Sequence, residues 1–202
     1  MEKRQRQKQE TRQLLTEAAC RVFAKKGIVS ARMSDIAQAA GVSHGTVFLH
    51  FETQEALVTQ VTAQVCGAIA ARTHALSEGC GTLRGLLEAH LRGIAEFEPF
   101  YTRLVIENRL LPQGARDAWL AVQSAVSLHF SRVAAAESAC AGKDTALLFN
   151  TWVGLVHHYL ANGDLFAPAG GVIRRYGTTL ADFYMALAVP QTETLSRQGA
   201  GE

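Results

Sequence analysis

The segment GVSHGTVFLHF, residues 41–51, gathers small and hydrogen-bonding side chains in a stretch that contains no Asp, Glu, Lys or Arg. The hydroxyls of Ser43 and Thr46 and the imidazoles of His44 and His50 can donate and accept hydrogen bonds. Gly45 has no side chain, so another molecule can approach the backbone closely there. The chemistry that this stretch offers is recognition by contact and hydrogen bonding.

Motifs that carry catalysis are missing from the sequence. There is no GxSxG, no HExxH and no phosphate-binding glycine loop, and GCGTLRG at residues 79–85 does not follow a strand pattern. His157 and His158 are consecutive, so on a helix they point about 100° apart and do not form a metal-binding pair. We therefore expect no enzyme activity, no cofactor and no metal site.

The four cysteines are far apart in the sequence and form no CxxC pair. This spacing argues against a disulfide framework or a zinc site. Cys80, which lies between two glycines, is the best candidate for a redox-sensing thiol, whereas free cysteines are more often small buried hydrophobic residues. The positions are Cys20, Cys66, Cys80 and Cys140.

The elements that must position the opening segment are helices. Apolar residues recur at spacings of three and four along nearly the whole chain, and no strand pattern is found. Gly27 ends the first helix, Gly41 supplies a tight turn, and Ser43 and Thr53 are suitable helix caps. Helices are predicted up to residue 26 and at about 33–40, 43–51, 53–77, 83–97, 99–111, 115–136, 144–160 and 171–188.

Charge is distributed unevenly along the 202 residues. Residues 1–50 carry nine Lys/Arg and four Asp/Glu, a balance of +5, which leaves −3 for the remainder of a chain with net charge +2. The basic cluster within the first dozen residues suits a polyanion such as a nucleic acid, or else forms a solvated, disordered tail. Its members are Lys3, Arg4, Arg6, Lys8 and Arg12.

Two short helices joined by a glycine turn, with an apolar helix before them and a long helix after them, form a helix-turn-helix pattern. The second short helix of such a unit enters the major groove of DNA. Val47 and Phe51 are expected to face the core instead. The residues expected to contact DNA are Arg32, Ser34, Ser43, His44, Gly45, Thr46, Phe48, Leu49, His50 and Gln54.

Residues 28–58, IVSARMSDIAQAAGVSHGTVFLHFETQEALV, resemble the DNA-binding region of the TetR/AcrR family of transcriptional regulators. The resemblance covers about 50 residues and includes the run Ala40-Gly41-Val42-Ser43. It departs from the family pattern at Ala31, Phe48 and Gln54, where threonine, tyrosine and lysine are usual. The two later changes remove contacts to phosphate, so we expect a shallower salt dependence of DNA binding.

The resemblance implies an all-α fold of about nine helices with an N-terminal helix-turn-helix domain and a C-terminal ligand-binding and dimerisation domain. We place the first at residues 1–52, the second at 53–190 and a disordered tail at 191–202. No apolar run reaches the length of a membrane span and no signal peptide is found, so a cytoplasmic protein is expected.

The last two predicted helices, at residues 144–160 and 171–188, are apolar around much of their circumference. This pattern favours a subunit interface, or else a larger internal core. In proteins similar to this chain the last two helices pair in a homodimer, so a two-fold operator with inverted half-sites is implied. The interface candidates are Trp152, Leu155, His158, Tyr176, Leu180, Phe183, Tyr184 and Leu187.

The resemblance also implies a ligand cavity among the middle helices. Several polar side chains lie on otherwise apolar or aromatic helix faces there, either as ligand contacts or as hydrogen-bonded core residues. With no basic cluster on these faces, a hydrophobic or weakly polar effector is expected. The candidates are His90, Tyr101, Asn108, Trp119, His129 and Asn150.

The sequence therefore predicts a dimeric repressor that binds a palindromic operator and is released by a small molecule. Repression is favoured over activation only because the family mostly represses. The alternatives are a helical interaction protein, a redox protein acting through Cys80 and a sequence-independent nucleoid protein, which should carry more charge than +2. The effector, the operator sequence and the regulated genes cannot be read from the residues.

Overall fold

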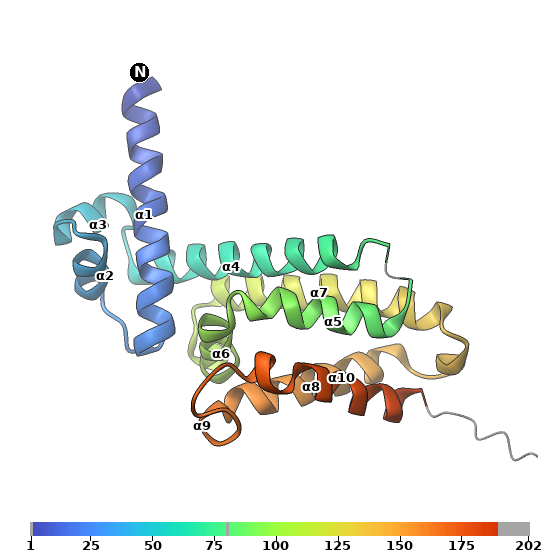
Figure 1. The fold of residues 1–202 in the computed structure, drawn as a ribbon. Helices are drawn as coiled ribbons and strands as arrows, with labels where there is room; N and C mark the ends of the chain where they lie inside the picture. The colour runs from blue at the N-terminus through green and yellow to red at the C-terminus, as the bar shows by residue number, and fades with distance from the viewer. Residues whose placement is uncertain (1, 80, 190–202) are drawn as a thin grey trace, which may run out of the picture.

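The computed structural model describes residues 2–79 and 81–189, and its regular elements are all helical (Figure 1). These ranges hold ten α-helices, one more than predicted, because short α9 stands apart from α8. The helices are α1 (Glu2–Lys26), α2 (Met33–Ala40), α3 (His44–His50), α4 (Gln54–Ser77), α5 (Leu83–Ala95), α6 (Glu98–Glu107), α7 (Gln113–Ala136), α8 (Thr145–Ala161), α9 (Gly163–Phe166) and α10 (Val172–Ala188), with 3₁₀ turns η1 (Asn108–Leu110) and η2 (Ser138–Cys140). The all-α prediction is confirmed, and the tail predicted after residue 190 lies outside the described residues.

Local signals explain where the short helices begin and end. Gly41 ends α2 with φ +68°, a left-handed conformation that other residues rarely adopt. Ser43 Oγ accepts a hydrogen bond from the amide of Thr46 at 3.1 Å and so caps α3. In the same way, Thr53 Oγ1 caps α4 by accepting from the amide of Ala56 at 3.1 Å. The predicted turn and both predicted caps are confirmed.

The first three helices and the start of α4 form a head at one end of an elongated body (Figure 1). Their apolar faces meet in a core that leaves the outer face of α3 free. The buried residues of this core include Leu15, Ala18, Phe23, Ile36, Val47, Phe51 and Leu57. Val47 and Phe51 therefore face inward, as predicted.

In the body, α4 packs against both α5 and α7, while α8 and α10 lie along the edge opposite α4 (Figure 1). α10 is fastened to α5 by the ion pair between Arg84 and Asp182. Within the described ranges, no helix combines the length and apolar character needed to cross a membrane.

Both ends of α6 carry a carboxylate that accepts hydrogen bonds from other elements. Glu107 Oε2 accepts from the amide of Val29, in the loop between α1 and α2, at 2.8 Å. At the other end, Glu98 accepts from the amides of Val172 and Ile173 at 2.6 and 3.2 Å and caps α10. Gly27 has φ +94°, and a Cβ there would lie 2.8 Å from Glu107 Oε1. The glycine therefore permits the close approach of the loop to α6.

Three of the residues expected at a subunit interface lie inside the protomer. Trp152, Leu180 and Tyr184 are buried in the body, and the rings of Trp152 and Tyr184 are in edge-to-face contact, 5.3 Å apart. They were placed on the wrong side of their helices because both faces of α8 are apolar, and because α10 carries apolar residues on its exposed side as well as on its buried side. The outer face carries His158, Phe183 and Leu187, with Leu155 and Tyr176 half-buried.

Of the cysteines, Cys80 lies outside the described residues, so the redox hypothesis for it is not addressed by the structure. Cys20, Cys66 and Cys140 are free. Burial raises the pKa of Cys66 to about 12. Its thiol is therefore protonated and unreactive at neutral pH.

Candidate nucleic-acid interface

The outer face of α3 is exposed and carries no fixed charge. Ser43, His44 and Gly45 at its start are exposed, and Thr46 is half-buried. Further along, Leu49 is 80 % exposed and Phe48 is 42 % exposed, with the Phe48 ring edge-on to His44 at 4.9 Å. Exposed apolar side chains beside hydroxyls and imidazoles suit the methyl groups and polar edges of bases in a major groove.

The back of α3 is held by a side chain from the first helix. Arg12 Nη1 donates to the carbonyl oxygen of His50 at 2.6 Å, and the guanidinium lies over the Phe51 ring at 4.2 Å. Arg12 therefore positions α3, whereas the sequence placed it among the cations free to meet a polyanion. Only its pairing across 38 positions in the chain reveals this role.

His50 is half-buried, and its Nδ1 has no hydrogen-bond partner among the described residues. Desolvation, followed by the positive charges of Lys8 and Arg12, lowers the pKa of its imidazole. The ring is therefore neutral at physiological pH. At the C-terminal end of α3, His50 is therefore a hydrogen-bonding group without charge.

The N-terminal half of α1 extends beyond the head as a helix (Figure 1) and is not a disordered tail within the described residues. Lys3, Arg4 and Lys8 are exposed. Arg6 forms an exposed ion pair with Glu10 one turn later, at 2.9 Å. These cations therefore lie on a regular helix that neighbours α3.

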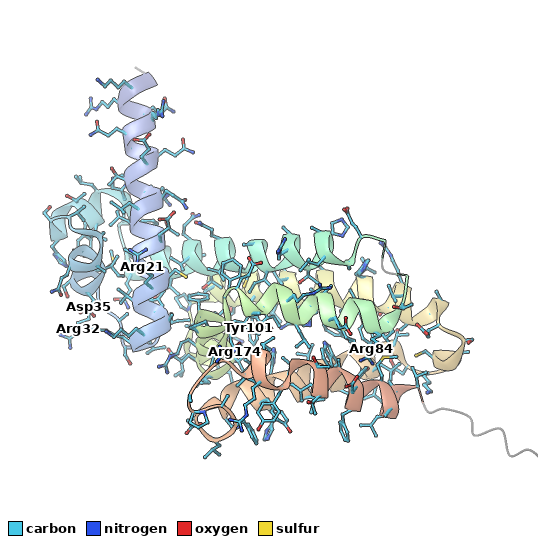
Figure 2. The ribbon with its side chains drawn as sticks, in the orientation of Figure 1. Arg21, Arg32, Asp35, Arg84, Tyr101 and Arg174 are labelled. Atoms are coloured by element: carbon cyan, nitrogen blue, oxygen red, sulfur yellow. The ribbon has the colours of Figure 1, made fainter. Side chains whose placement is uncertain are left out.

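The other residues expected to contact DNA lie on α2 and at the start of α4. Arg32 and Ser34 are exposed at the start of α2, and the Asp35 carboxylate accepts from the amide of Arg32 at 3.0 Å (Figure 2). Gln54 is half-buried, and its Nε2 donates to the carbonyl oxygen of Ala31 at 2.8 Å. Gln54 thus connects α4 to the loop before α2 and keeps its amide oxygen and one N–H for another partner.

Among the predicted ligand contacts, Tyr101 lies deep within the body (Figure 2) at the centre of a polar cluster. Its hydroxyl lies 2.9 Å from His157 Nε2 and accepts from Gln123 Nε2 at 2.9 Å. Trp119, on α7, lies beside the His157 ring at 5.9 Å. Sequence analysis missed Gln123 and His157, because neither lies on a helix face that looks unusual by itself.

A second buried pair joins α5 to α8. Trp152 Nε1 donates to His90 Nδ1 at 3.1 Å. Desolvation, followed by the charge of His157, lowers the pKa of His90 to about 4, and desolvation lowers the pKa of His157 to about 4. Both imidazoles are therefore neutral and act as hydrogen-bonding core residues.

The remaining candidates are separated from this cluster. Asn108 donates to the carbonyl oxygen of Val105 at 2.9 Å, at the end of α6, and Asn150 is exposed on α8. His129 lies instead in a groove of about 390 Å³ formed by α4, α5 and α7. The structure therefore does not bring the six predicted ligand contacts together at one site.

Comparison with known proteins agrees with this geometry. Residues 15–61 match the sequence profile of the bacterial regulatory proteins, tetR family. The match covers α1 from Leu15 onward, α2, α3 and the start of α4. Residues 15–61 therefore belong to the TetR/AcrR family of transcriptional regulators.

Individual relatives match over only a part of the chain. The chain is 36% identical over 59 residues to the HTH-type transcriptional regulator AcrR of Shigella flexneri, which covers 29% of this chain and 27% of AcrR. It is 32% identical over 90 residues to a probable acrEF/envCD operon repressor of Escherichia coli K12, covering 45% of this chain and 34% of that protein. The match thus spans only about a quarter to a third of the length of these relatives.

The likeness of the whole fold extends further. A regulator from Saccharomonospora viridis, solved in complex with choline, superimposes with a TM-score of 0.72 over 87% of this chain and 95% of the other, at 18% identity. The family match thus identifies residues 15–61 as the DNA-binding region of a TetR-type transcriptional regulator. The shared fold beyond residue 61 says nothing about which ligand this chain binds.

Proposed function

We propose that this protein is a homodimeric transcriptional repressor that binds an inverted-repeat operator through α3 and leaves it when a small molecule binds the body. The observation that carries the proposal is the exposed, uncharged outer face of α3, held from behind by Arg12. The repressor role is supported by the relative described as an operon repressor. We divide the chain near residue 53 into a DNA-binding head and an effector and dimerisation body.

The dimer would form through the outer faces of α8 and α10. Phe183 and Leu187 are 56% and 61% exposed, and Leu147 on α8 is 65% exposed. Exposed apolar side chains on two adjacent helices favour association with a second copy. A two-fold pair would present its α3 helices to half-sites about one helical turn apart, roughly 34–36 Å.

A charge in this face would test the dimer. Replacing Leu187→Glu should convert the protein to monomer in sedimentation velocity, because a carboxylate would be buried without a partner. Leu120→Glu, at an exposed position of α7, is the matched control and should leave the dimer intact. A wild-type protein that sediments as a monomer contradicts the proposal.

Release of DNA by an effector requires that a change in the body reaches the head. Two connections between the body and the head allow this. α4 begins four residues after α3 ends, and Glu107 of α6 holds the loop before α2 through Val29. A ligand that shifts α4 or α6 would therefore change the angle at which α3 is held. The related structure with choline supports a small-molecule role for this fold.

Fluorescence anisotropy with the DNA that flanks the protein's own gene tests operator binding. His44→Ala should weaken binding roughly 5- to 150-fold, the cost of about 1–3 kcal/mol for a lost base contact. Ser124→Ala, an exposed change on α7, is the control and should have no effect. The proposal is contradicted if unrelated DNA competes for the protein as well as the operator DNA does, and if His44→Ala leaves the affinity unchanged.

A further inference from the structure

The groove between α4, α5 and α7 has an apolar lining that a small molecule can occupy. Its volume of about 390 Å³ lies within the usual range of ligand pockets. It is open to solvent on one side, so a ligand can enter without opening the body. The apolar residues that line it are Ala70, Ala71, Leu86, Ala125, Val126 and Leu128.

Three nitrogen-bearing side chains from two helices meet in the lining of this groove. His74 comes from α4, and His129 and Arg132 come from α7. The two imidazoles are edge-on, with ring centroids 6.2 Å apart. The nearby carboxylate is that of Glu78, 3.5 Å from His74 Nε2, and both of these side chains are 69% exposed. Such an exposed pair contributes little. Desolvation, followed by the positive charges of His74 and Arg132, lowers the pKa of His129, so Arg132 supplies the fixed positive charge of the cluster.

Two of these groups have unused hydrogen-bonding capacity. His129 Nε2 is inaccessible to water and has no hydrogen-bond partner in the part of the chain that the structure describes. Arg132 is exposed, and among residues 2–79 and 81–189 no carboxylate pairs with it. Polar atoms in a protein interior are normally satisfied, so an unpaired buried nitrogen beside a groove marks a place where a ligand atom can bind once the imidazole turns toward it.

We propose that this groove binds a small amphipathic organic acid, whose carboxylate meets His129 and Arg132 while its apolar part covers the alanine and leucine lining. A planar guanidinium binds a carboxylate with two parallel hydrogen bonds, which a neutral polar group cannot match. The proposal rests on the effector role proposed above and gives the chemical class of that effector.

The acidic head group differs from what the sequence suggested. His74 and Arg132 lie on the polar sides of their helices, so neither belongs to the apolar stripes from which a weakly polar effector was expected. The packing of α4 against α7 brings them to one groove. A metal ion fits less well, because no three ligating side chains gather within the described ranges.

Isothermal titration of the full-length protein with two isosteric probes tests the proposal. 1-Naphthaleneacetate carries the carboxylate, and 1-naphthaleneacetamide has the same shape without the charge. We expect the acid to bind at least about tenfold more tightly than the amide. Equal affinities, or no binding of the acid, would overturn the proposal.

Substitutions then locate the site. Arg132→Gln should weaken the acid about tenfold and leave the amide unchanged, since only the charge-assisted hydrogen bonds are lost. Arg116→Gln, which removes an exposed cation from the first turns of the same helix, is the matched control and should change neither. Ala125→Phe should weaken both probes by filling the groove. An Arg132→Gln protein that binds the acid like the wild type, with an unchanged melting temperature, refutes the site.

Operator release is measured separately, by adding the acid to the protein on its DNA. Binding of the acid without release supports the groove as an anion site and contradicts its role as the effector site. Binding of the acid by a protein that does not bind DNA supports the groove and contradicts the proposed function. The two proposals therefore fail in different experiments.

Discussion

Two clusters that contain histidine share α7 but differ in how their polar atoms are satisfied. In the interior, Tyr101 bonds both Gln123 and His157, so its hydroxyl is fully used. In the groove, His129 Nε2 has no partner among the described residues, and Arg132 forms no ion pair there. The interior cluster joins α6, α7 and α8, whereas the groove lies between α4, α5 and α7.

This difference in hydrogen bonding distinguishes polar groups that stabilise the fold from polar groups that are available to bind a ligand. Polar atoms that satisfy one another in a protein interior fix the arrangement of the helices that carry them. Polar atoms without partners cost stability and are retained where a ligand can use them. Residue type alone does not distinguish these roles, since both clusters are built from histidine and its neighbours on similar helices.

The largest effect is expected in the interior, where Trp152 fills the space between α8 and α5. Trp152→Ala should lower the free energy of unfolding by about 3–5 kcal/mol, because it leaves a cavity and removes the donor to His90. Urea unfolding at fixed protein concentration measures this loss. A loss below about 1 kcal/mol would mean that the neighbouring helices collapse onto the site, and the interior would then not be rigid.

Tyr101→Phe removes one oxygen and leaves two half-buried partners without that hydrogen bond. We expect a loss of about 1–3 kcal/mol, since Gln123 and His157 were bonded to that oxygen. Tyr159→Phe, which changes a half-buried ring on α8, serves as the comparison and should cost less. Equal losses in the two variants would contradict a special role for the interior cluster.

The pH dependence of stability should reveal the buried imidazoles. The pKa values of His90 and His157 are lowered in the folded state to about 4 from the ordinary 6.5, so the unfolded chain binds protons first. Stability is complete above about pH 6.5 and falls as the pH is lowered towards 4. Urea unfolding between pH 7 and 5 measures the slope before most carboxylates titrate, and His157→Gln should reduce it. If His157→Gln leaves the slope of stability against pH unchanged, other groups are responsible for the titration.

The smallest effect on stability is expected in the groove. His129→Leu replaces an unpartnered imidazole by an apolar side chain of similar size, so the free energy of unfolding should change by less than about 0.5 kcal/mol or increase. The same variant should weaken binding of the naphthalene acid. A loss as large as that of Tyr101→Phe would show that His129 has a structural partner and would remove the contrast between the clusters.

The head was largely predictable because its signals are local. Gly41, Ser43 and Thr53 each determine a turn or a cap through atoms only a few residues away. The helix boundaries at residues 33–40 and 53–77 were accordingly predicted within one residue. What local spacing did not reveal is the use of Arg12 as a brace for α3, which depends on contact between α1 and His50.

The body was predictable as helices but not as sites. Helical periodicity gives the apolar face of each helix, but α8 is apolar on both faces, and so Trp152 was assigned outward instead of inward. Gln123 and His157 were missed because their partner Tyr101 comes from another helix, and Arg132 was missed because the groove that it lines is formed by three helices. Which polar side chains meet depends on packing angles that spacing within one helix does not contain.

The ten residues of α6 form a strut that is fastened at both ends, by Glu107 to the loop before α2 and by Glu98 to the first turn of α10. α10 is the helix proposed to meet a second protomer. In the proposed dimer, pairing of the two protomers would therefore be coupled through α6 to the tilt of their DNA-binding heads, even when no ligand is bound. A change in self-association would then alter operator affinity, and, by reciprocity, operator DNA would strengthen self-association.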